Sequence, residues 1–206
     1  MKKIYLFMTM AMMAFATAFT ACEDEQVNPN NNDPQSDGDE NANYQMYSFN
    51  TTLDYTSTNP SSSKGYSASS NQLVSQANAD ICAGSVNQYG DFICASNANL
   101  LTQCYDANSK DYRGTKATLI QNLGDVDIDD YRDVDYLSTM SITPSYLGGS
   151  QKLGSGIDHI SNGQAFAFQT SDGCKGVAKV SSVTKLNRKI TISGYVAVPK
   201  NSSLAK

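Results

Sequence analysis

Aspartates gather in one stretch of the sequence, at a spacing that could serve metal binding or acid–base chemistry. The stretch contains Asp125, Asp127, Asp129, Asp130, Asp133 and Asp135. Its opening D-x-D-x-D pattern is typical of a calcium loop, in which carboxylate oxygens coordinate the ion. An EF-hand also requires glycine at the sixth position and glutamate at the twelfth, where this chain has Asp130 and Tyr136. Asp125, Asp127 and Asp129 therefore stay candidates for a calcium site of another kind, and a solvated loop leading into a helix is the better account.

The same carboxylates define a hypothesis of catalysis, namely a small exported hydrolase that cleaves glycans with a pair of acids. Residues 44–206 contain no glutamate, so only aspartates could supply that pair. His159 is the single histidine of the chain, and no G-x-S-x-G motif accompanies it. A Ser-His-Asp triad is therefore not indicated. The sequence predicts no particular catalytic residue and no cofactor.

Four cysteines follow residue 43: Cys82, Cys94, Cys104 and Cys174. In an exported protein an even number of cysteines favours disulfides. Cys82 and Cys94 flank an expected hairpin loop almost symmetrically, which makes them the first candidate pair and leaves Cys104 with Cys174 as the second. The alternative is that some are buried free thiols, because their spacing shows no zinc pattern and cysteine packs like a small hydrophobic residue.

Tyrosine is the remaining residue type that could bind a ligand. Eleven tyrosines follow residue 43, and the chain contains no tryptophan. Rings with polar tips can serve as platforms for a glycan, although tyrosines on ordinary sheet faces are the simpler explanation. A glycan, a peptide or another protein is therefore the expected partner of this domain.

The elements that must position these residues read mainly as strands. In residues 164–170 small and large apolar side chains alternate, as Ala165-Phe166-Ala167-Phe168, and the run leads into Asp172-Gly173. Asp-Gly after such a run is a strong signal for a hairpin that returns through Val177 and Val180. Further along the chain, Ile190, Ile192, Val196 and Val198 share one parity, as in a strand with one buried face.

Other segments complete the expected fold. Strands are predicted over 46–55, 79–84, 91–95 and 116–123, short helices from residue 96 or 97 and over 129–137, and a loop over 57–71. The expected fold class is mainly β, either sandwich-like or α+β with an antiparallel sheet and one or two short helices.

The N-terminus has the pattern of an export signal. Met1-Lys2-Lys3 precedes an uncharged apolar run that ends at Ala21, so residues 1–21 are predicted to be a signal peptide. A membrane-spanning anchor is the competing interpretation, but acidic residues rather than basic ones follow the apolar run.

The end of this run, Ala18-Phe19-Thr20-Ala21-Cys22, resembles a bacterial lipobox, which implies that Cys22 is lipidated after cleavage. The following Glu23-Asp24-Glu25 resembles the export signal of Bacteroidota surface lipoproteins. The resemblance implies a lipid anchor in the outer membrane and a domain that faces the exterior. Two or more acyl chains on one cysteine would give a stable anchor.

The hairpin near the C-terminus carries a second resemblance. The pattern F-x-T-x-x-G-x-x-G-x-x-K-V runs from Phe168 to Val180 and is similar to a C-terminal hairpin of many Bacteroidota lipoproteins. This resemblance implies a β-rich exported fold and no specific activity.

Charge separates a tether from a domain. Residues 22–43 comprise the lipidated cysteine and a segment with seven acidic residues and no basic one, so they are predicted to form a disordered linker. Residues 44–206 are predicted to be a single β-rich domain, and they contain 13 acidic and 13 basic residues. A formally neutral domain is not expected to bind nucleic acid, which requires clustered Lys and Arg. A non-catalytic binding domain on a membrane anchor is therefore the favoured interpretation.

Overall fold

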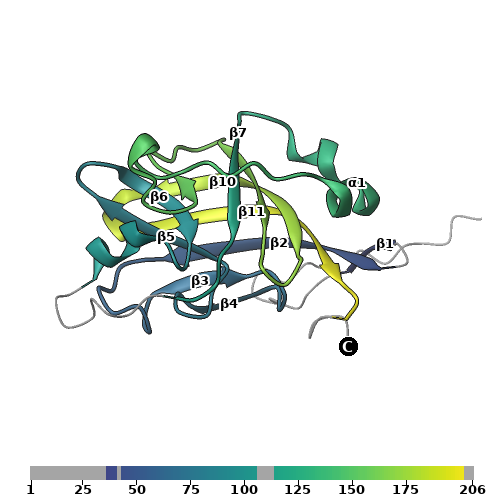
Figure 1. The fold of residues 1–206 in the computed structure, drawn as a ribbon, viewed down its shortest axis with the longest axis horizontal. Coiled ribbons are helices and arrows are strands. Elements are labelled where there is room, and N and C mark those ends of the chain that lie inside the picture. The colour runs from purple at the N-terminus through teal and green to yellow at the C-terminus, as the bar shows by residue number, and fades with distance from the viewer. Residues whose placement is uncertain (1–35, 41–42, 106–113, 202–206) are drawn as a thin grey trace, which may run out of the picture. The chain divides into compact units, whose positions relative to one another are not determined.

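The fold is described from a computed structural model, which covers residues 36–40, 43–105 and 114–201 (Figure 1). The expected signal peptide, Cys22 and most of the expected linker lie outside these residues. None of the helices in the described part of the chain is long and apolar enough to cross a membrane.

One antiparallel sheet organises the described residues, and the mainly β class predicted from the sequence is confirmed. Its strands follow the order β7-β9-β10-β11-β2-β3-β5-β6-β8, while β1 pairs with β2 and β4 pairs with β3. The strands are β1 (Ser36–Glu40), β2 (Tyr44–Asp54), β3 (Lys64–Ser67), β4 (Gln72–Ser75), β5 (Ile81–Val86), β6 (Gly90–Ala95), β7 (Leu119–Gly124), β8 (Gly156–Ile157), β9 (Ala165–Gln169), β10 (Lys175–Thr184) and β11 (Lys189–Pro199).

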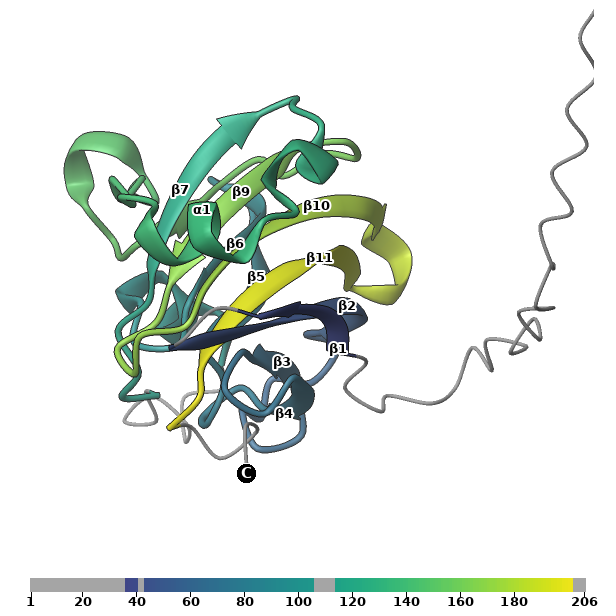
Figure 2. The same ribbon diagram turned by 90° about the vertical axis from the view of Figure 1, so that its right-hand side faces the viewer.

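The sheet is nearly closed into a barrel rather than split into two packed sheets. Figure 2 shows the strands following one another from β7 through β10 and β11 to β3. At the seam between β7 and β8, the Ile120 amide donates to Ser155 Oγ at 2.8 Å. The amide of Ser145 donates to the Ile120 carbonyl at 2.7 Å, and that of Gly156 donates to the Ser145 carbonyl at 3.0 Å. These bonds satisfy part of an edge that would otherwise be open.

Side chains fill the barrel interior, which forms the first hydrophobic cluster. The rings of Phe49 and Tyr66 stack with centroids 4.4 Å apart, and Phe168 meets each of them edge-on at 6.3 Å and 6.4 Å. Ile190 and Ile192 point into this cluster from β11, as their shared parity predicted. The inside of the barrel is thus a packed core, and ligands must be sought on its outer surfaces.

Two smaller clusters cover parts of the outside. The second lies over β5 and β6 beneath the 3-10 helix η1 (Asn99–Cys104), with Leu147 from a later loop. The third lies over β2, β9, β10 and β11, where Met46, Ala167, Val177 and Ala197 meet the segment 125–143. That segment contains the 3-10 helix η3 (Ile128–Tyr131) and the helix α1 (Val134–Thr139).

Two strands lie where the sequence predicted a loop or a disordered linker, and β4 and β8 also lie outside the predicted strands. β3 lies inside the expected loop 57–71; its four residues are too few to show a period, and its position is fixed by pairing with β4 and β5. β1 lies inside the expected linker and pairs with the first part of β2 through an irregular register. β3 bridges β2 at Asp54 alone, so β1 pairs with a stretch of β2 that β3 leaves open.

Candidate functional site

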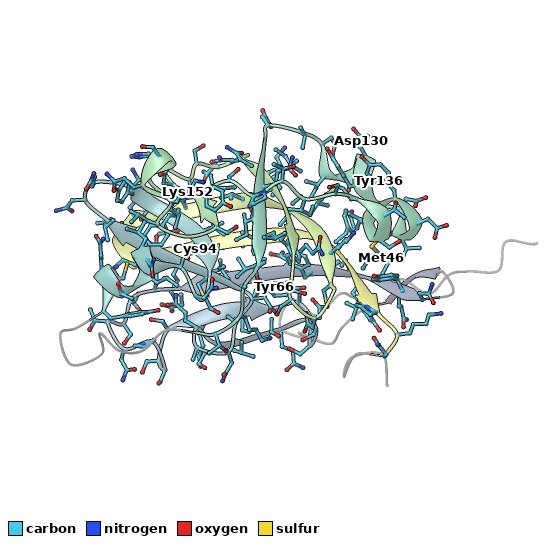
Figure 3. The ribbon with its side chains drawn as sticks, viewed as in Figure 1. Met46, Tyr66, Cys94, Asp130, Tyr136 and Lys152 are labelled. Atoms are coloured by element: carbon cyan, nitrogen blue, oxygen red, sulfur yellow. The ribbon has the colours of Figure 1, made fainter. Side chains whose placement is uncertain are left out.

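Tyrosines from three parts of the chain gather on the outer surface over the third cluster. They are Tyr44 from β2, Tyr195 from β11, Tyr131 from η3 and Tyr136 from α1, and together we call them the tyrosine face. The rings of Tyr131 and Tyr136 lie 5.8 Å apart at a tilted angle. Tyr136 is 52% exposed, and it lies on the outside of the domain near Asp130 (Figure 3).

Local capping explains why this segment is helical. The Asp127 carboxylate accepts from the amide of Asp129 at 3.1 Å and begins η3. The Asp133 carboxylate accepts from the amide of Tyr136 at 2.7 Å and begins α1. Carboxylates are favoured at both positions because they satisfy unpaired amides and face the positive end of the helix dipole. Val134 and Leu137 then fix the inner side of α1 by burial.

Two lysines of β10 hold the segment against the sheet. Lys175 Nζ donates to the carbonyl of Met140 at 2.8 Å, beyond the end of α1. Lys179 Nζ lies 3.3 Å from Asp125 Oδ1 and 3.3 Å from the carbonyl of Val126, before the start of η3. The segment is therefore attached at both ends, and its side chains are presented from a fixed position.

Polar contacts also orient the tyrosine face from below. The Tyr195 hydroxyl donates to Asp129 Oδ1 at 2.6 Å, and the guanidinium of Arg132 lies 5.5 Å from the centre of the Tyr195 ring. A guanidinium over an aromatic ring is an attractive cation–π arrangement. These contacts restrict Tyr195 and Arg132 before any ligand arrives.

A hollow of about 400 Å³ lies beside Tyr44, at the end of the barrel where β2 begins and β11 ends. It is lined by Asn43, Tyr44, Pro199, Lys200 and Asn201. The Lys200 amide donates to the Asn43 carbonyl at 2.9 Å and joins its two sides. Tyr44 lines the hollow and also packs against the third cluster.

The six aspartates of residues 125–135 are all exposed. The three calcium candidates go to different partners: Asp125 pairs with Lys179, Asp127 caps η3, and Asp129 accepts from Tyr195. No group of three or more metal-binding side chains within the described residues is arranged to hold an ion. A two-acid hydrolase also requires a pair of carboxylates on either side of the bond that is cleaved, and the contacts of Asp125, Asp127, Asp129 and Asp133 join them to four different partners rather than to one another.

A buried charge cluster, which sequence analysis missed, lies at one end of the barrel. The Asp80 side chain is 0% exposed and faces Lys116, whose Nζ lies 3.2 Å from Oδ1 and 3.4 Å from Oδ2. The amide of Ala68 donates to Asp80 Oδ2 at 2.9 Å. Asp80 and Lys116 are far apart in the sequence, and neither occurs in a motif. The sequence alone therefore gives no indication that Asp80 and Lys116 form an ion pair.

Burial and nearby charges set the ionisation of this cluster. Desolvation raises the pKa of Asp80, although Lys116 and the Ala68 amide act in the opposite direction. For Asp172, desolvation also acts upward, but hydrogen bonds from Thr170 and Ser69 and the charge of Lys116 leave its pKa below the ordinary value. Lys116 thus faces two carboxylates that differ in their readiness to ionise.

His159 and a second polar group lie near the β5–β6 hairpin. The Tyr55 hydroxyl donates to Asp91 Oδ1 at 3.0 Å, and Arg188 lies over the Tyr55 ring at 5.7 Å. Burial raises the pKa of Tyr55, and the hydrogen bond to Asp91 raises it further. His159 has a positive φ of 51° and lies against Gly90. The His159 side chain is exposed.

The four cysteines are free thiols in the structure. Cys82 and Cys94 lie directly opposite each other on β5 and β6, which confirms the predicted hairpin but not a bond between them. Cys104 packs against the second cluster and Cys174 belongs to the first, so the second candidate pair is split between two cores. Desolvation raises the pKa of all four thiols, that of Cys174 to about 12, and so makes them poor nucleophiles.

Comparison of the chain with protein-family models, with curated proteins and with solved structures gives no match. The candidate site is therefore defined by its own geometry, as an aromatic and hydrogen-bonding surface on a packed β-barrel.

Proposed function

We propose that this chain is a lipid-anchored lipoprotein of the outer membrane that faces the exterior and carries a non-catalytic binding domain. The anchor is Cys22, by resemblance to a lipobox, and the acidic residues after it resemble a surface-export signal. The partner is a glycan, a peptide or another protein, and it contacts the domain at the tyrosine face.

The observation that carries the binding part of the proposal is the exposed Tyr136 on a segment held at both ends. Loops that lie on a rigid scaffold commonly carry binding residues. Tyrosine and arginine contribute much of the energy at binding surfaces. The tyrosine ring in particular is amphipathic and loses little entropy on contact, because it has only two side-chain torsions. Lys175 and Lys179 supply the rigidity here, through their bonds to Met140 and to residues 125 and 126.

Binding is better supported than the alternative of a glycan hydrolase. The aspartates that could act as its acid pair are all exposed, and four of them are engaged: Asp127 and Asp133 cap helices, Asp125 contacts Lys179, and Asp129 accepts from Tyr195. The buried Asp80 is screened from substrate by its 0% exposure.

Fatty-acid labelling of cells that express the full chain tests the anchor. An alkyne-tagged fatty acid should label the wild-type protein and the Cys104→Ala control, and the label should be lost in Cys22→Ala. Protease added to intact cells should then remove the domain of the wild-type protein. Label that persists in Cys22→Ala, or a domain that stays protected on intact cells that carry the label, would refute the anchor or the outward orientation respectively.

A further inference from the structure

We infer that the partner of the tyrosine face is a second copy of this chain, which places the tip of its β10–β11 hairpin against Tyr136 and Asp130. The tip comprises residues 185–189, Lys-Leu-Asn-Arg-Lys, and we call it the basic tip. This inference rests on the proposed function, because it names the partner of the same surface. Three observations lead to it: the exposed leucine of the tip, the charges of the two surfaces, and their separation within one molecule.

The basic tip presents an apolar side chain to solvent. Leu186, in the 3-10 helix η5 (Lys185–Asn187), is 98% exposed, the most of any large hydrophobic residue in the described part of the chain. Tyr136 is the next most exposed, at 52%. Burial of a leucine against an aromatic ring removes apolar surface of both from water and is favourable. The two surfaces therefore complement each other in their apolar parts.

The base of the tip is supported, so its exposed end projects from a fixed turn. Lys189 Nζ lies 3.4 Å from Asp54 Oδ2, and the guanidinium of Arg188 lies 5.7 Å from the centre of the Tyr55 ring. The amide of Tyr55 also donates to the Arg188 carbonyl at 3.1 Å. A turn that is already ordered loses little further entropy when it binds.

The charges of the two surfaces are opposite, and they come from one chain. Residues 125–135 carry six exposed aspartates and one arginine, which favours a cationic partner. Removing them from the 13 acidic and 13 basic residues of 44–206 leaves 7 acidic and 12 basic residues. The complement of the acidic surface is thus carried by the same domain, and three of those basic residues lie in the basic tip.

One residue on each surface is available for an ion pair between copies. Asp130 and Lys185 are both exposed, and neither forms an ion pair within the described residues. Asp130 lies at the same end of the domain as Tyr136 (Figure 3), and Lys185 adjoins Leu186. Each surface therefore offers one charge beside one apolar group.

The contact cannot form within one molecule. Segment 125–143 is bonded to the start of β10, where Lys175 Nζ donates to the Met140 carbonyl at 2.8 Å, whereas the basic tip follows the end of β10. β10 has 10 residues, which at about 3.3 Å per residue separates the two surfaces by roughly 30 Å. A basic tip that reaches a tyrosine face therefore belongs to another copy.

Carbodiimide cross-linking of the full chain carrying Cys22→Ala tests the inference, because this reagent joins a lysine to a carboxylate only where the two are in contact. Cys22→Ala removes the proposed acyl chains, so the test does not depend on the anchor. We expect covalent oligomers at millimolar protein concentration, since a contact made by one turn is small and weak. Mass spectrometry should find Lys185 linked to Asp130.

Leu186→Ser keeps the reactive pair but removes the apolar contact. It should lower the yield of the Lys185–Asp130 link about tenfold, the effect of one lost leucine contact. The matched control is Leu119→Ser on β7, where the leucine is also exposed, at 38%, and this variant should give the parent yield. Each variant must also unfold at the parent temperature.

Exchange of the two charges tests the pairing itself, by sedimentation equilibrium. Lys185→Glu and Asp130→Lys should each weaken self-association about tenfold, because like charges then meet. A mixture of these two variants, or one chain that carries both substitutions, should associate as the parent does. Added salt should weaken association of the parent.

Three results would overturn the inference. They are the absence of covalent oligomers in the parent, an equal yield of the link in Leu186→Ser and Leu119→Ser, and exchanged charges that fail to restore association. If the parent does not associate but binds poly-lysine, and Tyr136→Ala loses that binding, the partner is a basic polypeptide instead. That outcome would leave the proposed binding function intact, and none of these results affects the labelling of Cys22.

Discussion

Replacement of Lys116 by methionine should destabilise the domain strongly, because it removes the cation that faces the Asp80 carboxylate. The Asp80 side chain is 0% exposed and that of Lys116 is 30% exposed. Loss of one partner from a buried ion pair costs about 3–5 kcal/mol. Water can reach the space left by a partly exposed lysine, so we expect a value of about 3 kcal/mol, at the lower end of that range. The melting temperature should fall by roughly 6–12 °C for a domain of this size.

The cost of Lys116→Met should also depend on pH. Because the pKa of Asp80 is raised in the folded protein, the protonated acid favours folding, and this contribution is present at low pH and lost as pH rises through the folded pKa. Without Lys116, one of the influences that lower this pKa disappears, and the pKa rises further. The penalty should therefore be largest at pH 7 and shrink toward pH 4.

Urea unfolding at pH 7 and at pH 4 measures both effects. The control is Lys189→Met, which breaks the partly exposed pair with Asp54, where Nζ and Oδ2 are 3.4 Å apart. That change should cost less than about 1 kcal/mol. Combining Lys116→Met with Asp80→Asn should recover stability relative to Lys116→Met alone, because no buried charge is then left without a partner. The reasoning would be refuted if Lys116→Met lowered the free energy of unfolding no more than Lys189→Met does. It would also be refuted if the loss caused by Lys116→Met were as large at pH 4 as at pH 7.

Four further outcomes are expected. Asp133→Ala removes the cap of α1 and should cost about 1 kcal/mol in urea unfolding. Gly194→Ala places a Cβ against the backbone of Val177 and should cost at least about 1–3 kcal/mol. Asp172→Asn should reduce the loss of stability on acidification. Because the pKa of Asp172 is lowered in the folded protein, its ionised carboxylate stabilises the fold at a pH above the ordinary pKa of an aspartate. That contribution is lost as the pH falls through the pKa of Asp172 in the folded protein. Finally, the buried thiols of Cys82, Cys94 and Cys174 should react with a thiol reagent only on unfolding, and the unfolded domain should show four reactive thiols without added reductant. A count of two would reveal a disulfide.

Local patterns in the sequence predicted the parts of the fold that depend on near neighbours. The Asp172-Gly173 turn marked the β9–β10 hairpin, and the shared parity of Ile190 and Ile192 marked β11. The first signal depends on the backbone conformation that glycine allows in a tight turn, and the second on the two-residue period of a strand with one buried face. β3 has neither signal, because four residues are too few to show a period. Its position is set by pairing with β4 and β5.

The candidate site was predictable only in part. The aspartates of residues 125–135 were recognised as a cluster, and Asp133 is indeed at the start of a helix, but their isolation from one another depends on contacts with Lys179 and Tyr195. The tyrosine face joins β2, β11 and the 125–143 segment across a sheet. No spacing in the sequence shows that Tyr44 and Tyr131 pack against the same cluster.

The attachment of the 125–143 segment by Lys175 and Lys179 has a consequence for how this protein can change over generations. Within the segment, only Val134, Leu137 and Ile142 are buried; its other side chains are partly or fully exposed. Substitutions at those other positions do not change the side chains of the barrel core. Selection can therefore alter what the surface recognises while the residues of the barrel core stay the same. An engineer could use the same arrangement by exchanging the segment as a cassette between its two lysine contacts.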